Sequence, residues 1–182
     1  MDCTQGYAGE PIGYEIFVPQ SKAGSLWNTL MDEGLDHCMG AVGLNAADSL
    51  RVEAGLPLYG KDLAGPYHIS PVEAGFGSSI KLHKPFFIGR QNMLSSSPSR
   101  RIVRLRAEID ATNLTELEPT IHDDSGKIIG VTTSTAYISG QYYGLGLLDE
   151  NPFDGKVYLS YDGSPSLLAE ILSNPYSAVV EA

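Results

Sequence analysis

Cysteine, basic residues and long apolar runs are all scarce in this chain. The 182 residues include two cysteines, Cys3 and Cys38, which cannot form a disulfide framework or a four-ligand zinc site. No run approaches the roughly 18 apolar residues of a membrane-spanning helix, and the first residues lack the basic and apolar regions of a secretory signal. We therefore expect a cytoplasmic protein, in a reducing compartment, with no membrane as partner.

The charge is strongly one-sided. The chain has 12 lysines and arginines against 22 aspartates and glutamates, a formal net charge of -10. Such a charge repels phosphate backbones, so we expect no nucleic acid as partner and no anionic membrane surface. Hydrophobic residues make up 42% of the chain, which excludes disorder and allows a buried core at this length.

The common catalytic and metal-binding motifs are also missing from the sequence. There is no glycine-rich phosphate loop, no Gly-x-Ser-x-Gly elbow, and no pair of histidines or cysteines at metal-ligand spacing. The four histidines are scattered singly, which favours packing or surface roles. We therefore predict no metal site and assign no catalytic residue.

The serine-rich stretch at residues 95–99 is the predicted boundary between a first domain, 1–94, and a second, 95–182. In the first domain, apolar residues at helical spacing run from a candidate N-cap, Ser21, to a candidate C-cap, Gly34. A second helix is expected to begin at a capping asparagine and to end at a glycine, over residues 45–55.

In the second domain the apolar period changes to two. Residues 103–110 alternate apolar and charged side chains, as in a strand with one buried face. Residues 123–126 predict a hairpin turn, 143–148 and 156–161 fit further strands, and 166–172 is expected to add one or two helical turns. We therefore predict an α+β protein, in which an α/β segment precedes a small antiparallel β-barrel or sandwich.

Two charged residues are candidates for ligand binding. Glu10 lies in a glycine-flanked segment, where a flat ligand could approach the backbone and a carboxylate could accept two hydrogen bonds from a pterin edge. The alternative is a loop carboxylate that caps nearby amides. Arg51, on the second predicted helix, could clamp a ligand carboxylate bidentately or pair with Asp48 three residues earlier. The residues alone leave these alternatives open.

Four blocks of sequence resemble the folate-binding aminomethyltransferase family, which includes the T-protein of the glycine cleavage system. They follow the family's order and spacing, and a weaker similarity continues in the second domain. The blocks are GYAGE with GYEI over residues 6–16, AVGLNAADSLRVEAGLPLYGKDL over 41–63, SPVEAG over 70–75 and FIGR over 87–90, and the weaker one is GVTTS over 130–134.

The resemblance implies a tetrahydrofolate-dependent transferase of one-carbon units, aminomethyl or methyl. On matching positions it implies that Glu10 holds the pterin ring and that Arg51 faces the folate, toward its glutamyl carboxylate. Tyr7 and Tyr59 lie in the same blocks and would shape the folate-binding site. The implied partners are folate, a small amine or methyl donor, and a lipoyl carrier protein if the reaction is glycine cleavage.

The chain also departs from the family pattern. Family members are longer, and the blocks found here match only their C-terminal half. The missing half contributes one wall of the folate channel and an aspartate that organises the transfer, so no residue here inherits that role. We therefore weigh an incomplete transferase against a non-catalytic folate-binding or assembly module that is completed by a complementary N-terminal chain. Plain truncation is the third possibility.

Overall fold

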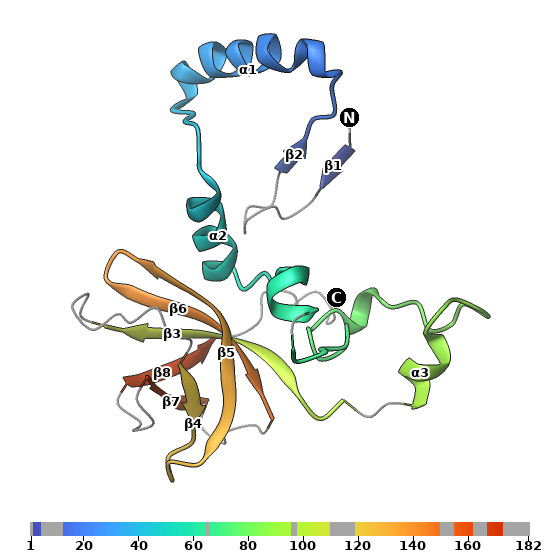
Figure 1. Ribbon diagram of the computed structural model, residues 1–182, viewed down its shortest axis with the longest axis vertical. Helices are drawn as coiled ribbons and strands as arrows, with labels where there is room; N and C mark the ends of the chain where they lie inside the picture. Colours follow the sequence, from blue (N-terminus) through green and yellow to red (C-terminus); the bar gives the residue numbers. More distant parts are fainter. Residues whose placement is uncertain are drawn as a thin grey trace.

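The computed structural model describes residues 2–4, 13–64, 66–95, 98–109, 119–149, 155–161 and 167–172. A β-barrel lies at one end, a loop-rich segment with short helices runs beside it, and a long helix with a small hairpin lies at the opposite end (Figure 1). Tyr7 and Glu10 lie outside the described residues.

Six antiparallel strands close the barrel in the order β3-β6-β5-β4-β7-β8, and pairing between β3 and β8 completes the ring. This confirms the predicted α+β class and selects the barrel over the sandwich. The predicted turn at residues 123–126 joins β4 to β5, and the Gly126 amide donates to the Asp123 carbonyl (3.1 Å). The strands are β3 (Arg101–Glu108), β4 (Thr120–His122), β5 (Ile128–Ile138), β6 (Gln141–Leu148), β7 (Lys156–Ser160) and β8 (Leu167–Leu172).

Every strand contributes apolar side chains to the barrel core. On β3 the predicted alternation is present, because Val103, Leu105 and Ala107 are buried while Glu108 is exposed. The glycine at position 146 lies close against the core, since a Cβ atom there would lie 2.5 Å from Cδ1 of Ile121 and would require that side chain to shift. The core residues are Val103, Leu105, Ala107, Ile121, Ile129, Tyr142, Leu148, Val157, Leu159 and Ala169.

The prediction of helical turns over residues 166–172 was wrong. Leu167–Leu172 forms β8, which pairs with β7 on one side and with β3 on the other. Closing a sheet into a barrel removes its unpaired edges, and this gain outweighs the local helical preference of a leucine-rich segment.

The first long helix, α1 (Gln20–Gly34), begins earlier than expected. Its N-cap is Pro19, which offers no side-chain cap, so Ser21 lies inside the helix. Gly34 is the last residue of the helix. Its backbone is right-handed, so it does not form the left-handed cap that a C-terminal glycine often provides. A Cβ atom at this position would lie 2.7 Å from Cβ of Met39, so close packing explains this glycine.

The second helix, α2 (Leu44–Glu53), is capped at its C-terminal end by the predicted glycine, but the expected N-cap was wrong, because the N-cap is Gly43 and Asn45 lies inside the helix. Gly55 has a positive φ of 81°, and its amide donates to the Val52 carbonyl (3.0 Å) while the Leu56 amide donates to the Arg51 carbonyl (2.8 Å). These two bonds form a Schellman cap, which needs a residue tolerant of left-handed geometry. The cap turns the chain toward the barrel.

The remaining elements are short. They are β1 (Asp2–Thr4) and β2 (Gly13–Glu15), which pair antiparallel, η2 (Leu35–His37), the single π-turn η3 (Tyr59–Leu63), η4 (Gly77–Ser79) and α3 (Arg90–Ser95).

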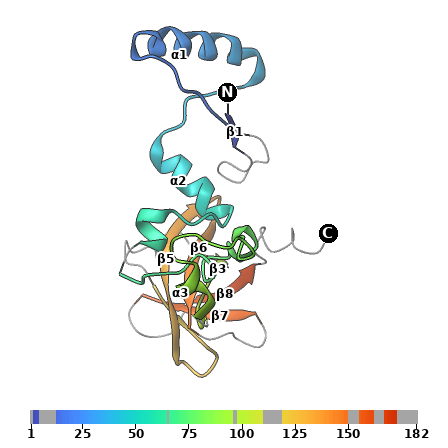
Figure 2. The same ribbon diagram turned by 90° about the vertical axis from the view of Figure 1, so that its right-hand side faces the viewer.

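The two ends of the molecule differ in how they pack. α2 and η3 lie against the barrel, whereas α1 and the β1–β2 hairpin stand away from it in both views (Figures 1 and 2). Within the described residues, no helix has the length and apolar character that crossing a membrane requires.

Candidate functional site

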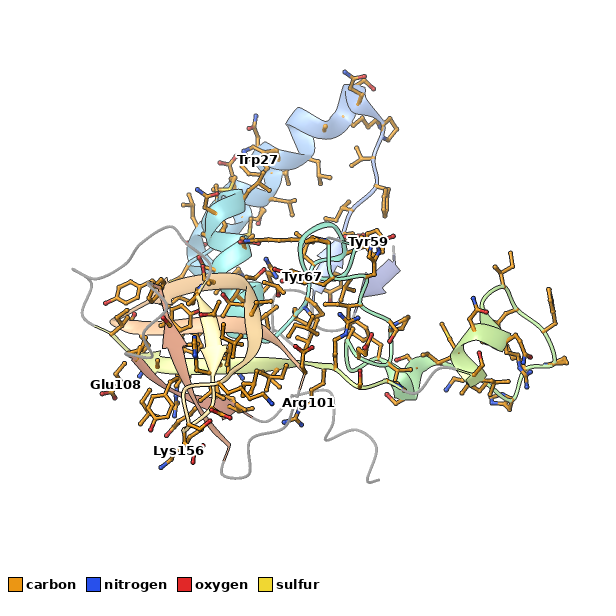
Figure 3. All side chains as sticks on the ribbon, turned by 60° about the horizontal axis from the view of Figure 1, so that its bottom comes forward. Trp27, Tyr59, Tyr67, Arg101, Glu108 and Lys156 are labelled. Carbon is orange, nitrogen blue, oxygen red and sulfur yellow. The ribbon has the colours of Figure 1, made fainter. Side chains whose placement is uncertain are left out.

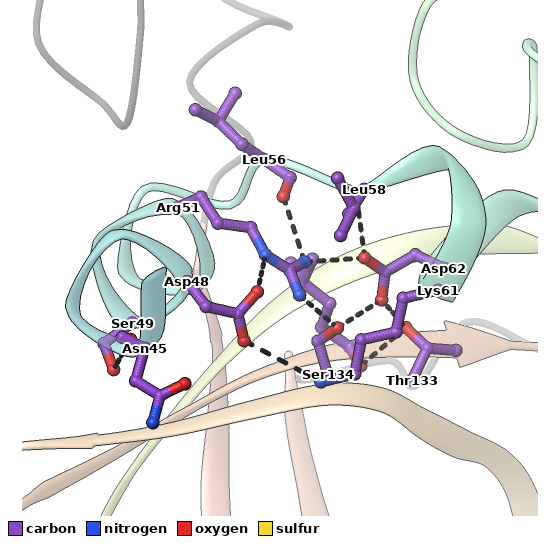
Figure 4. Close-up of polar contacts among 11 residues, drawn as sticks. Asn45, Asp48, Ser49, Arg51, Leu56, Leu58, Lys61, Asp62, Thr133 and Ser134 are labelled. Atoms are coloured by element: carbon purple, nitrogen blue, oxygen red, sulfur yellow. Dashed lines mark hydrogen bonds and ion pairs between the residues drawn. The ribbon is translucent and has the colours of Figure 1, made fainter. Parts of the chain in front are cut away.

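A buried polar network joins α2 and η3 to barrel strand β5 (Figure 4). Its cation is Arg51, in the last turn of α2, where a positive charge is favoured by the helix dipole. Only 8% of Arg51 is exposed. A guanidinium buried to this extent needs partners for its N–H groups, since an unpaired buried charge is strongly destabilising.

The anion of the network is Asp62, on η3, which is completely buried. Its carboxylate accepts hydrogen bonds from four donors, two on each oxygen, so its acceptor capacity is well used. Oδ2 accepts from Arg51 Nη1 (2.6 Å) and the Leu58 amide (2.7 Å), and Oδ1 accepts from Thr133 Oγ1 (2.6 Å) and Ser134 Oγ (2.6 Å).

A β-bulge brings two consecutive hydroxyl groups to the same carboxylate oxygen. Consecutive residues of a regular strand point to opposite faces of the sheet. In β5, Thr132 pairs with Gly146 and Ser134 pairs with Leu145, so Thr133 is an extra residue in the ladder. Such a bulge re-aims side chains. It allows Thr133 and Ser134 both to reach Asp62.

Arg51 uses most of its donors inside this network. Its Nε donates to Asp48 Oδ1 (2.8 Å), which is the intrahelical pair that the sequence offered. Nη1 also donates to the Leu56 carbonyl (3.3 Å), and Nη2 donates to Ser134 Oγ (2.8 Å). A guanidinium has five N–H groups, so these four bonds leave a single N–H, on Nη2, for another acceptor. A bidentate clamp on a ligand carboxylate is therefore not available in this arrangement.

Tyr59 is the first residue of η3, and 74% of it is exposed. Asp62 fixes the turn that carries it, since the carboxylate accepts from the Leu58 amide at the N-cap of η3. The structure therefore places Arg51 and Tyr59 on neighbouring elements with opposite environments, one enclosed and one open. Figure 3 shows Tyr59 on the loop-rich side of the molecule, apart from Glu108 and Lys156 of the barrel.

A second polar cluster fixes the loop at residues 70–76 to the start of β3. Glu73 accepts from the Ser70 amide (2.8 Å) and from Arg100 Nε (3.1 Å), while the Ile102 amide donates to the Glu73 carbonyl (2.8 Å). Burial acts to raise the pKa of the Glu73 carboxyl, but the bonds from Ser70 and Arg100 together outweigh it and hold that pKa below its ordinary value. These contacts give Glu73 a structural role.

The sequence did not single out Asp62, although it lies in the block over residues 41–63, which ends in LYGKDL. An aspartate three residues before a glycine-proline pair resembles any loop carboxylate, and its partners Thr133 and Ser134 are 71 and 72 residues away. Only the tertiary structure brings them together. Among the described residues, no group of three or more His, Cys, Asp or Glu is arranged to hold a metal ion.

Known proteins resemble the chain in sequence and in structure. The model of the family described as the GCVT N-terminal domain matches residues 3–84. An aminomethyltransferase of Caldanaerobacter subterraneus is 45% identical over 89 residues, which are 49% of this chain and 23% of that protein. An aminomethyltransferase of Halalkalibacterium halodurans is 34% identical over 176 residues, which are 94% of this chain and 47% of that protein.

A solved structure resembles the fold. The crystal structure of the glycine cleavage system aminomethyltransferase T from Bartonella henselae matches with a TM-score of 0.70 and 28% identity, covering 94% of this chain and 48% of that chain. Almost the whole of this chain takes part in both matches. The chain nevertheless spans only about half the length of each of these two relatives. On this evidence the chain belongs to the aminomethyltransferase family of the glycine cleavage T-protein.

Proposed function

We propose that this chain forms part of a tetrahydrofolate-dependent transferase that moves an aminomethyl or methyl group, as the T-protein resemblance implies. The observation that carries the proposal is the family match over residues 3–84, which includes the segments of Tyr7, Glu10, Arg51 and Tyr59. In this proposal residues 1–94 belong to the folate-binding domain and residues 95–182 to the barrel domain.

Glu10 is the proposed partner of the pterin ring. A carboxylate can accept two hydrogen bonds from an N–H and an amino group on the same edge of a heterocycle, and each such bond contributes about 1.5 to 3 kcal/mol when shielded from water. Tyr7, three residues earlier, would shape the same site. Both positions rest on the sequence resemblance.

Among the described residues, Tyr59 is suited to contact a folate, whereas Arg51 can make few hydrogen bonds to one. The exposed ring of Tyr59 is open to contact with a flat ligand, and its turn is fixed by a satisfied network. Arg51 offers one N–H, so we propose that it positions η3 and Tyr59 for the folate and makes at most one hydrogen bond to a glutamyl carboxylate.

The proposed chemistry is transfer of one carbon between an amine donor and folate. Tetrahydrofolate, when bound, supplies the nitrogen that accepts the carbon, and the residues of this chain bind and orient it and exclude water. The donor would be a lipoyl carrier protein in glycine cleavage, or a small methylated amine in a demethylase relative. The proposed location is the cytoplasm.

A second candidate function is a non-catalytic folate-binding or assembly module that is completed by a partner chain. The specific observation in its favour is the exposure of large apolar side chains along α1 and the segment that follows it. Turnover with tetrahydrofolate and an aminomethyl-loaded lipoyl carrier, measured after this chain is combined with the part of the T-protein fold that it does not match, separates the two candidates. The module would bind folate and produce no transfer even in that complex.

Calorimetry with tetrahydrofolate tests the proposed binding site. We expect Glu10→Gln to weaken binding by about 1 to 3 kcal/mol, since the charge-assisted bonds to the pterin would be lost, and to leave the fold intact. Glu15→Gln is the matched control, because Glu15 is an exposed carboxylate on β2. Equal affinities of the two variants would remove Glu10 from the site.

A further inference from the structure

The helix α1 lacks the local features that stabilise a helix in water. It has no side-chain N-cap, no acidic residue in its first turn and no basic residue in its last, where Asp32 and Glu33 instead face the negative end of the dipole. Gly24 lies in its interior. A helix of 15 residues is marginal in isolation, so most of its stability must come from packing.

That packing is not provided by the described part of the chain. The one buried residue of α1 is Gly34, and α1 makes its main contacts with the adjoining turn η2. Trp27, on α1, is 56% exposed (Figure 3). Ten large apolar side chains are exposed between residues 13 and 50: Tyr14, Ile16, Phe17, Trp27, Leu30, Leu35, Met39, Val42, Leu44 and Leu50.

We propose that this apolar surface, over residues 13–50, is an interface for the part of the T-protein fold that this chain does not match. The Bartonella henselae protein has a counterpart for 94% of this chain, and 52% of it lies outside the match. The proposed occupant is therefore a polypeptide that corresponds to that remaining part. A segment that exposes ten large apolar side chains is a candidate interaction site, because exposed apolar patches mark such sites on soluble proteins.

The charge of the segment specifies the rim of the partner. Residues 13–50 carry one lysine and five carboxylates, one of which, Asp48, is already paired with Arg51. Because charges around an apolar interface are usually complementary, the partner should present basic residues around an apolar centre. The association should then weaken as salt is added, since exposed ion pairs are screened.

The single tryptophan makes docking visible. Trp27 is the only tryptophan of the chain, so its emission reports on α1 alone. The probe is the unmatched part of the Bartonella henselae protein, made without tryptophan and first shown to bind the matched part of its own chain. It is then coexpressed with this chain and purified by a tag on the probe.

We expect copurification, a blue shift of the Trp27 emission and loss of acrylamide quenching. Leu30→Ser and Leu35→Ser should each weaken the complex about tenfold or more. The matched control is Ile128→Ser on the barrel, which removes an equally exposed apolar residue (59%, against 68% for Leu35) and should leave the affinity unchanged.

Three results would overturn the proposal. They are no complex with the validated probe, equal weakening by Leu35→Ser and Ile128→Ser, and a stable homodimer of this chain in which Trp27 is already protected. The interface rests on the family relationship and its test does not use folate. A complex that binds no tetrahydrofolate would overturn the proposed activity and leave the proposed interface standing. Binding of tetrahydrofolate by this chain without formation of a complex would overturn the interface and leave the proposed activity standing.

Discussion

The barrel and the segment over residues 13–50 are built from the same kinds of residue and bury them to opposite extents. Residues 101–172 expose two large apolar side chains in the described part, Ile128 and Leu168, whereas residues 13–50 expose ten. The barrel strands cover one another because the ring is closed. The α1 segment has one amphipathic helix and one two-stranded hairpin, and neither can bury an apolar face alone.

The comparison assigns the fold's stability to the barrel and its attached network. α2 and η3 share that stability because Arg51 and Asp62 join them to β5. Perturbing the barrel or the network should therefore be costly, while perturbing the α1 segment should cost little in the isolated chain.

The largest effect is expected for Asp62→Ala. This change removes the buried anion of the Arg51 guanidinium, which keeps only its ion pair with the partly exposed Asp48. It also removes the shared acceptor of two buried hydroxyls, so we expect a loss of about 3 to 5 kcal/mol in the free energy of unfolding. Chemical denaturation measures it. Asp36→Ala, an exposed carboxylate on η2, is the control and should be close to neutral. A cost below about 1 kcal/mol for Asp62→Ala would mean that the network does not hold the two regions together.

A core deletion in the barrel tests the other half of the comparison. Leu105 is completely buried among residues of the barrel core. We expect Leu105→Ala to cost about 2 to 5 kcal/mol, from lost burial and the cavity that remains. Urea titration with far-UV circular dichroism measures the change. Leu168→Ala, on β8 and half exposed, is the control, and similar losses in both variants would contradict the assigned core.

The two regions also differ in how well the sequence predicts them. The period-two pattern of β3 and the turn at residues 123–126 identify barrel strands because each signal is local. β8 was missed because its strand state depends on pairing on both sides, and one of its partners, β3, is remote in the sequence. The same holds for Asp62, whose importance depends on a bulge in β5. The α1 helix was recognised from its apolar spacing, but that spacing cannot tell whether a partner covers the face.

A pH-dependent effect is expected at Glu73, between the loop and β3. Its folded-state pKa lies below the ordinary value of 4.5, so its bonds stabilise the fold above pH 4.5 and lose this effect as the pH falls through the folded-state pKa. We expect Glu73→Gln to cost about 1.5 kcal/mol at pH 7, at the lower end of the range for charged hydrogen bonds because Arg100 is partly exposed.

Denaturation of the wild type and Glu73→Gln between pH 3 and pH 7 measures this difference. The gap between the two proteins should narrow toward acid, where both side chains are uncharged. Glu108→Gln, at the exposed end of β3, should show no gap at any pH. If the difference in free energy of unfolding between the wild type and Glu73→Gln were the same at every pH, the effect would come from side-chain packing and not from the charge of Glu73.

The smallest effect on stability is expected for Leu44→Ser. Leu44 begins α2 and is 89% exposed, so the change removes no packing and should alter the free energy of unfolding by less than about 0.5 kcal/mol. It should nevertheless reduce the tendency of the chain to aggregate, because it removes part of an exposed apolar surface. Light scattering at increasing concentration, beside a denaturation curve, measures both. If Leu44→Ser instead destabilised the isolated chain by 2 kcal/mol or more, the segment would already be packed in solution, and the contrast between the two regions would fail.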